Sequence, residues 1–214
     1  MSYLARISSS PLSQFFPLSI LSIAFTLLAG TVTAHGQQTT TATAKRTSEI
    51  SAFALYSRVH PDYGPSDNNG FTVGANYTLL NRWWINPSIE FRAKVANGST
   101  ADEKTFGGGI RGVKKIGRFS PYGDFLISYG SINLHLQNPP VLPDGSPYKS
   151  DTSIVYSYGG GLDYRAFGPF SVRGDFQYEK WYMDKLTNPY KPLHLSPYNW
   201  SMGVVYTIPF RRGR

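Results

Sequence analysis

Beyond the N-terminal quarter of the chain, apolar and polar side chains alternate in one segment after another. The clearest case is residues 83–95, where Ile89 and Phe91 share one face and Glu90 and Arg92 share the other. A period of two is typical of a β-strand, which places successive side chains on opposite sides of its sheet. Apolar residues at helical spacing are not sustained in any window of this part. The pattern therefore predicts an all-β fold.

Alternation of this kind recurs in eight segments, which are expected to be strands: residues 49–59, 71–79, 83–95, 104–116, 119–129, 154–165, 170–179 and 200–210. The first segment can be phased either way and glycines dilute the fourth, so the facing of both stays open. Links expected to be short are residues 80–82, 117–118 and 166–169, and links expected to be long are residues 60–69, 96–103, 133–151 and 183–197. A strand needs roughly 9 to 11 residues to cross a bilayer. The even number and the alternating links predict an eight-stranded antiparallel transmembrane β-barrel with short periplasmic turns and longer external loops.

The side chains on the two faces of the strands indicate that the barrel lies in a membrane rather than in water. The apolar face carries aromatic residues near the short links (Trp83, Phe119, Tyr164, Phe170, Tyr206, Phe210) and near the long links (Phe71, Tyr129, Tyr156, Tyr178, Trp200). Two aromatic belts are what two membrane interfaces select, whereas a soluble barrel has no need of them. We therefore expect lipid-facing positions at Val73, Ile89, Phe125 and Val204. We expect lumen-facing positions at Thr72, Glu90, Asp124 and Gly203.

The polar face carries ionic side chains of both signs: Glu90, Arg92, Lys94, Arg111, Asp124, Asp163, Arg165, Arg173, Asp175 and Glu179. At eight strands the interior of a barrel is just wide enough for side chains to fill. An unpaired charge there would cost several kcal/mol. These residues are therefore expected to form a structural charge network that fills the lumen.

The composition agrees with a barrel and excludes several kinds of reactive site. The chain has 15 Tyr and 13 Phe with only 16% charged residues, and its mean hydropathy of -0.27 suits strands whose apolar and polar faces cancel. It contains no Cys, which excludes disulfides, thiol nucleophiles and thiolate metal sites. A net charge of +8 would permit an anionic partner, but no nucleic-acid partner is expected.

The N-terminal residues are typical of a cleaved signal peptide. Residues 1–34 have Arg6 as their only charged residue, an apolar run over residues 15–29 and a small-residue ending at Ala34. The run is shorter than the roughly 20 residues of a spanning helix. A flexible leader is expected over residues 35–48, which are rich in Thr, Ala and Gln, and the barrel domain over residues 49–214.

Three segments and the last strand carry a resemblance to a known family. The segments are residues 118–130, 158–165 and 172–178. With the strands placed, the chain resembles the small outer-membrane β-barrel family, the porin-like proteins related to the OmpA membrane domain and OmpX. The last strand is similar to that family's assembly signal at Ser201, Gly203, Tyr206 and Ile208, with Phe210 as the terminal aromatic. That signal usually ends the chain, whereas a basic tail follows here.

The signal peptide predicts export, and the resemblance implies residence in the cell outer membrane. It also implies outer-membrane lipid and the outer-membrane assembly machinery as partners. It implies no particular activity.

Candidate catalytic chemistry is sparse. A lipid A deacylase resembling the known ones would need a Ser two residues from a His, but Gln137 follows His135 at that spacing. His60, His135 and His194 all fall in long links, where imidazoles could converge on a metal. Their unrelated spacings favour solvated side chains, so no metal, cofactor or catalytic site is expected.

The sequence thus predicts an outer-membrane β-barrel protein with a structural or surface-interaction role and a filled, salt-bridged lumen. Prolines stiffen residues 133–151 and 183–197, which are the expected contact sites for an envelope or surface partner. One alternative is a narrow porin-like channel for small solutes. A second alternative is a lipid-modifying outer-membrane enzyme.

Overall fold

The computed structural model describes residues 46–80, 84–135, 139, 141, 145–188 and 191–211. The regular elements in these residues are strands: β1 (Arg46–His60), β2 (Asn68–Leu79), β3 (Asn86–Asn97), β4 (Ala101–Val113), β5 (Phe119–Leu134), β6 (Ser150–Phe167), β7 (Phe170–Asn188), β8 (Lys191–Leu195) and β9 (Tyr198–Arg211). All of them lie in one compact unit, Ala44–Arg214. Among these residues no helix is long and apolar enough to cross a membrane.

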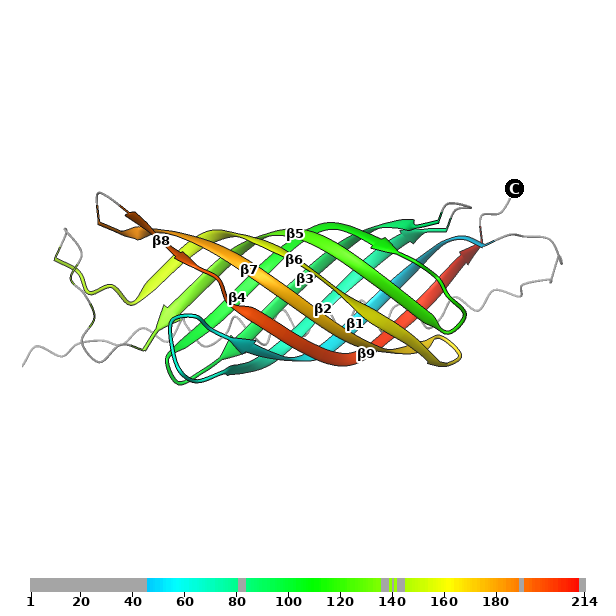
Figure 1. The fold of residues 1–214 in the computed structure, drawn as a ribbon, viewed down its shortest axis with the longest axis horizontal. Helices are drawn as coiled ribbons and strands as arrows, with labels where there is room; N and C mark the ends of the chain where they lie inside the picture. Colours follow the sequence, from blue (N-terminus) through cyan, green and yellow to red (C-terminus); the bar gives the residue numbers. More distant parts are fainter. Residues whose placement is uncertain are drawn as a thin grey trace, which may run out of the picture. The chain divides into compact units, whose positions relative to one another are not determined.

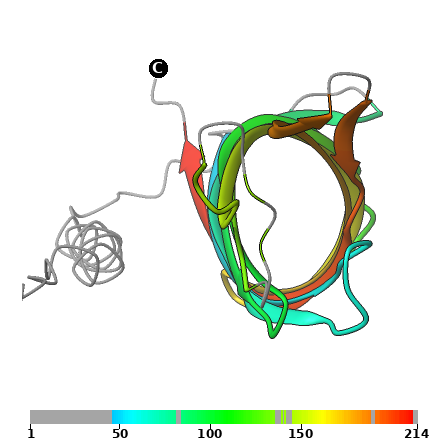
Figure 2. The same cartoon turned by 90° about the vertical axis from the view of Figure 1, so that its left-hand side faces the viewer.

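The strands close into an antiparallel barrel, shown from the side in Figure 1 and end-on in Figure 2. Neighbours in chain order pair from β1 to β7, and β9 pairs with β1 on one side and β7 on the other. β8 continues the line of β9 along β7, since Leu195 faces Trp181 and Trp200 faces Phe176. The two strands act as one wall interrupted at Ser196 and Pro197, so the expected eight-stranded barrel is confirmed.

Two ends of the barrel can be distinguished by their connections. The end where β2 joins β3, β4 joins β5 and β6 joins β7 is named the turn end, and the opposite end is named the loop end. At the turn end, residues 80–85, 114–118 and 168–169 connect the strands. At the loop end, residues 61–67, 98–100 and 135–149 connect them.

Several strand boundaries differ from those that the sequence predicts. The long link expected at residues 96–103 is reduced to residues 98–100, so the expected alternation of link lengths does not hold there. Much of the long link expected at residues 183–197 belongs to β7 and β8. The fourth strand spans Ala101–Val113 rather than residues 104–116, and β1 begins at Arg46, inside the expected leader.

The misplaced boundary of β7 has a physical cause. Towards the loop end, Trp181 and Met183 point inward and are each only 1% exposed, while Lys180 and Tyr182 point outward. Where a strand projects beyond the bilayer its outer face meets water, so the apolar side chains are buried inside the barrel instead. A search for an apolar outer face therefore ends such a strand too early.

The side-chain facing agrees with the alternation. Exposed on the outer wall are Val73, Ile89, Phe125 and Val204, and buried inside are Thr72, Glu90 and Asp124. Gly203 also faces the interior, where a Cβ would lie 2.2 Å from the carbonyl oxygen of Ala54. Trp84 is an exception, because it was expected inside and is 73% exposed. The strand begins only at Asn86, so the alternation does not yet apply to Trp84.

The structure shows which side chains face inward in β1 and β4, the two strands whose facing the sequence leaves open. In β1, Phe53 and Leu55 are buried in the interior. In β4, Arg111 is buried and Ile110 is exposed on the outer wall. The glycines that dilute β4 are needed for close approach, since a Cβ on Gly109 would lie 2.0 Å from the backbone oxygen of Phe125.

Aromatic side chains surround the outer wall near both ends. Exposed near the turn end are Phe119, Tyr164, Phe170 and Tyr206, and exposed near the loop end are Phe71, Tyr129, Tyr156 and Trp200. The rise from Phe119 to Tyr129, at about 3.3 Å per residue and a tilt of about 40°, gives roughly 25 Å, the height of the apolar band of membrane barrels. Of the expected belt, Trp83 and the side chain of Phe210 lie outside the described part of the chain.

A charge placed on the outer wall tests the membrane-facing assignment. Ile89→Arg lies between the two belts and should lower the free energy of unfolding by about 2 to 4 kcal/mol, because the guanidinium loses its water. Asn97→Arg, on the same face of β3 at its loop end, should cost only about 0 to 1 kcal/mol. Urea unfolding in lipid vesicles measures both, and equal costs would contradict the assignment.

Candidate functional site

The interior of the barrel contains a network of ion pairs, here named the lumen network. At its centre Arg92 on β3 forms ion pairs with three carboxylates. Its Nη2 lies 2.6 Å from Oε1 of Glu90 and 3.6 Å from Oδ2 of Asp124, and its Nη1 lies 2.9 Å from Oδ1 of Asp175. Gln177 adds a neutral donor, with Nε2 at 2.8 Å from Oδ1 of Asp124. Arg92 is therefore surrounded by acceptors contributed from separate strands.

A second group of the lumen network lies closer to the turn end. Arg173 donates from Nε to Asp163 over 2.7 Å, and Arg111 donates from Nη2 to the other oxygen of Asp163 over 2.8 Å. Both guanidiniums also lie near Oε2 of Glu90, at 3.2 Å for Arg111 and 3.8 Å for Arg173. Glu90 thus joins this group to Arg92.

Two aromatic rings lie beside the guanidiniums of the lumen network. The Arg111 guanidinium carbon lies 3.5 Å from the centroid of Tyr122, and that of Arg173 lies 4.5 Å from the centroid of Phe53. The Tyr122 hydroxyl donates to Asp175. Stacking on aromatic faces lets like-charged guanidiniums lie close together at lower cost, because the negative ring faces attract them.

The third group of the lumen network lies towards the loop end. Lys94 Nζ is 2.6 Å from Oε1 of Glu179 and 3.5 Å from Oε2 of Glu103. Trp181 donates from Nε1 to Glu179 over 3.1 Å, and the hydroxyl of Tyr63 donates to Glu103. Burial and the neighbouring carboxylate raise the pKa of Tyr63 above its ordinary value. Tyr63 therefore keeps its proton and remains a donor.

The residues expected in the lumen are brought together with one exception. Arg165 is exposed at the turn end, and no ion pair of its side chain is found in the described part of the chain. Sequence reasoning missed Glu103, because it lay in an expected loop. It also missed Glu49, which pairs with Lys115, because the phase of the first strand was open. Alternation carried through to Ala101 would have found Glu103.

The space on either side of the lumen network differs in character. Towards the loop end, the interior contains a cluster of buried apolar side chains: Ala101, Ile132, Val155, Trp181, Met183 and Leu195. Towards the turn end, a cavity of about 340 Å³ is lined by polar side chains that include Ser51, Asn76 and Thr207. Between them, beside Lys94 and Glu179, lies a void of only about 10 Å³. Of these two interior spaces, the larger therefore lies at the turn end.

The three histidines of the loop end each contact a different residue. His60 lies 2.7 Å from Asp67, His135 lies 3.2 Å from Asp102, and His194 packs edge-on against Tyr182. Hydrogen bonds from His60 and then from Arg58 hold the pKa of Asp67 below its usual range. In the described residues, no group of three or more His, Asp or Glu is arranged to hold a metal ion.

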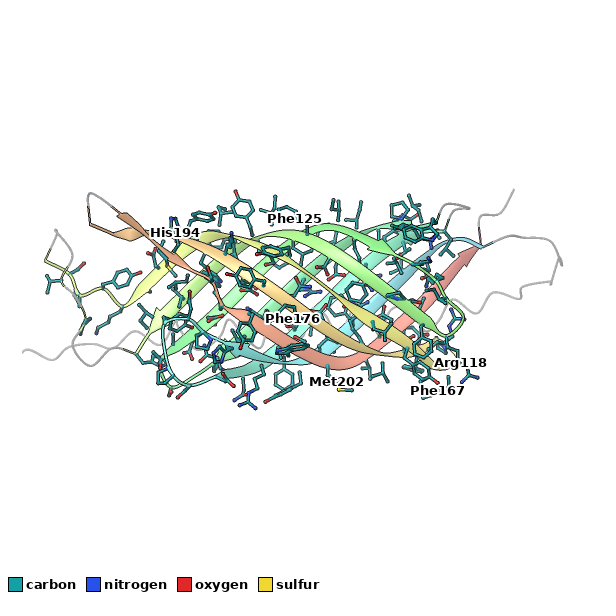
Figure 3. All side chains as sticks on the ribbon, viewed as in Figure 1. Arg118, Phe125, Phe167, Phe176, His194 and Met202 are labelled. Carbon is teal, nitrogen blue, oxygen red and sulfur yellow. The ribbon has the colours of Figure 1, made fainter. Side chains whose placement is uncertain are left out.

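Figure 3 shows the contrast between wall and ends: Phe125 and Met202 project from the outer wall, Arg118 and Phe167 lie at the turn end, and His194 lies at the loop end. A closed antiparallel sheet with an apolar wall, two aromatic belts and an ionic interior defines the class of small transmembrane β-barrels. The sequence matches the family model described as outer membrane protein beta-barrel domain over residues 23–207. The chain therefore belongs to the outer-membrane β-barrel family, and its location is the outer membrane.

Solved structures with a similar fold include Ail, the attachment invasion locus protein of Yersinia pestis, at 19% identity and a TM-score of 0.48, covering 77% of this chain and 99% of Ail. Neisserial surface protein A is 16% identical with a TM-score of 0.46, covering 74% and 96% of the two chains. The N-terminal β-barrel domain of Pseudomonas aeruginosa OprF is 10% identical with a TM-score of 0.48, covering 74% and 97%. No curated protein gives a significant sequence match.

The residues expected to direct export and assembly are only partly within the structure. The expected signal peptide, residues 1–34, lies outside the described residues, and the family match begins inside it. In β9, Ser201 and Gly203 face inward, and Tyr206 is exposed on the wall. Ile208 pairs in register with Ile50 of β1. Recognition of this strand by the assembly machinery stays a prediction.

Removing one cation from the lumen network should destabilise the barrel. Arg173 is fully buried, and Arg173→Ala should lower the free energy of unfolding by on the order of 3 kcal/mol, because buried carboxylates lose a partner. Arg165→Ala is the matched control, and its effect should stay within about 0.5 kcal/mol, as at other exposed positions. Urea unfolding in lipid vesicles gives both values.

Adding Asp163→Asn to Arg173→Ala tests the origin of that loss. The double variant should recover part of the stability, because it removes the carboxylate that Arg173 had neutralised. No difference between Arg173→Ala and Arg165→Ala would contradict a structural role for the ion pairs.

Proposed function

We propose that this outer-membrane barrel has a structural or surface-interaction role, with a filled lumen that conducts no steady current and with no catalytic step or cofactor. The turn end faces the periplasm and the loop end faces outward. The observation that carries the proposal is a set of ion pairs that join opposite walls of the barrel.

The pairs that span the lumen connect β3 and β7. In the closed sheet these two strands are separated by β4, β5 and β6 on one side and by β1, β2 and β9 on the other. Arg92 on β3 reaches Asp175 on β7 over 2.9 Å, and Lys94 on β3 reaches Glu179 on β7 over 2.6 Å. Side chains from facing walls therefore meet at hydrogen-bond distance, which supports a closed lumen.

Packing around these pairs supports the same conclusion. The void beside Lys94 and Glu179, about 10 Å³, has room for about one water molecule. The apolar cluster that contains Trp181 covers the network on its loop side. An ion passing through would have to separate buried pairs, and each uncompensated charge would cost several kcal/mol.

The ordered strands of the loop end support a role in surface contacts. β7 and β8 project beyond the belt as a hairpin, and Tyr148 lies in the described part of the link between β5 and β6. Tyr148 is buried, and its hydroxyl donates to Asp151 over 3.0 Å. Ordered external segments pay less conformational entropy on binding, so they suit contact with an envelope or surface partner.

Delivery to the membrane completes the proposal. Residues 1–34 direct export as a signal peptide and are removed, and residues 35–45 remain as a leader before β1. The last strand, with Ser201, Gly203, Tyr206, Ile208 and Phe210, is the part that the outer-membrane assembly machinery recognises. The apolar wall then contacts outer-membrane lipid.

Single-channel recording in a planar bilayer tests the closed lumen. The wild-type protein should give no steady conductance, because facing walls are bridged by buried pairs. Removing the two bridges and the indole that covers them, with Arg92→Ser, Lys94→Ser, Asp175→Ser, Glu179→Ser and Trp181→Ser combined, should produce measurable current. Migration of the unheated variant as a folded barrel on a gel shows that it has assembled.

The channel alternative makes the opposite prediction. It requires steady conductance of the wild-type protein, with Arg173→Ala changing ion selectivity and leaving the unfolding midpoint unchanged. That combination of results would replace the closed lumen by a narrow pore for small solutes.

A further inference from the structure

A hollow in the outer wall near the turn end is named the wall groove. Its volume is about 720 Å³, within the range of small-molecule sites. Its sides are apolar side chains from four consecutive strands and the adjoining turn: Tyr77, Leu79, Ile85, Ile89, Ile110 and Phe125. The groove is therefore a recess in the apolar outer wall, bounded by large side chains.

Two glycines form the floor of the wall groove. Gly112 on β4 lies opposite Gly123 on β5, and both occupy outward-facing positions. A Cβ built on Gly123 would meet only the backbone oxygen of Gly159, at 3.7 Å. The floor at Gly123 thus has space for a side chain that the sequence does not supply.

A cation lies beside one end of the wall groove. Lys114 is the next outward position after Gly112 towards the turn end, and its Nζ lies 3.9 Å from the ring centroid of Trp84. Trp84 is exposed and directly precedes Ile85, which lines the groove. No ion pair of Lys114 is found among the residues that the structure describes. Trp and Lys together at the end of an apolar band mark the level of lipid headgroups.

We propose that the wall groove binds an anionic phospholipid of the periplasmic leaflet, with an acyl chain along the glycine floor and the phosphate beside Lys114. Two observations define this chemistry. The apolar sides match a hydrocarbon chain, and the unpaired cation at the headgroup level attracts negative charge. The position at the turn end selects the periplasmic leaflet.

A second copy of this chain is the competing occupant. Burial against another barrel would use the apolar sides but would leave Lys114 without an anionic partner. The charge beside the groove therefore favours the lipid. This inference rests on the outer wall and does not depend on whether the lumen conducts.

Native mass spectrometry of the full barrel, released from detergent with defined lipid, measures each bound lipid separately. We expect phosphatidylglycerol to bind about fivefold more tightly than phosphatidylcholine of the same chain length, which is the contribution of about one lysine near a membrane surface. Lys114→Gln should reduce that ratio to about one, because it removes the charge. Gly123→Leu should weaken the binding of both lipids, because the side chain occupies the floor.

Matched controls are available on β7. Lys180→Gln removes an exposed outward lysine at the loop end, and Gly174→Leu fills an outward glycine that has no atom within 4 Å of its built Cβ. Neither should change the ratio or the affinity. Equal binding of the two lipids by the wild type, a preference unchanged by Lys114→Gln, or an affinity unchanged by Gly123→Leu would each overturn the proposal. If the wild type shows no lipid preference and forms a dimer that Gly123→Leu dissociates, the occupant of the groove is a second copy of the chain.

Discussion

The structure depends on the requirement that every backbone N–H and C=O in a bilayer be hydrogen-bonded within the protein. A sheet meets this requirement only when it has no free edge, and here β9 supplies the closure by pairing with β1 and β7. Closing at eight strands fixes a narrow interior. Because the outer wall must be apolar, the alternation of each strand then forces polar side chains into that narrow space. The lumen network is thus a consequence of closure.

The eight strands and the facing of most side chains could be predicted because one bilayer imposes one pattern on every strand. Where the surroundings change, the prediction fails. Trp181 and Met183 invert the pattern beyond the belt, so the strand predicted at residues 170–179 ends before both of them. Glu103 was missed because the predicted fourth strand began one residue too late, at residue 104. The prediction also fails for Trp84 at the turn end, because Trp84 precedes β3, the strand to which it was assigned.

The partners within the lumen could not be predicted from alternation, since a period of two gives the face of a residue but not its height or its neighbours across the barrel. Arg92 and Asp175 meet because the register places β3 and β7 at matching levels on facing walls. Arg165 has the right parity but lies too close to the turn end to reach the network. The Gly112 and Gly123 pair likewise becomes a groove only when β4 and β5 are in register.

The charges of the lumen network do not balance by ion pairs alone, since its carboxylates outnumber its cations. The excess is compensated by neutral donors, each aimed at a particular carboxylate: Tyr63 at Glu103, Tyr122 at Asp175, Gln177 at Asp124, and Trp181 and Asn199 at Glu179. Hydrogen bonds to an ionised group are stronger than those between neutral groups. Neutral donor side chains also fill the space between the walls more tightly than an additional cation with its bound water would. Ion pairs and neutral donors together therefore hold the facing walls of the barrel in one arrangement.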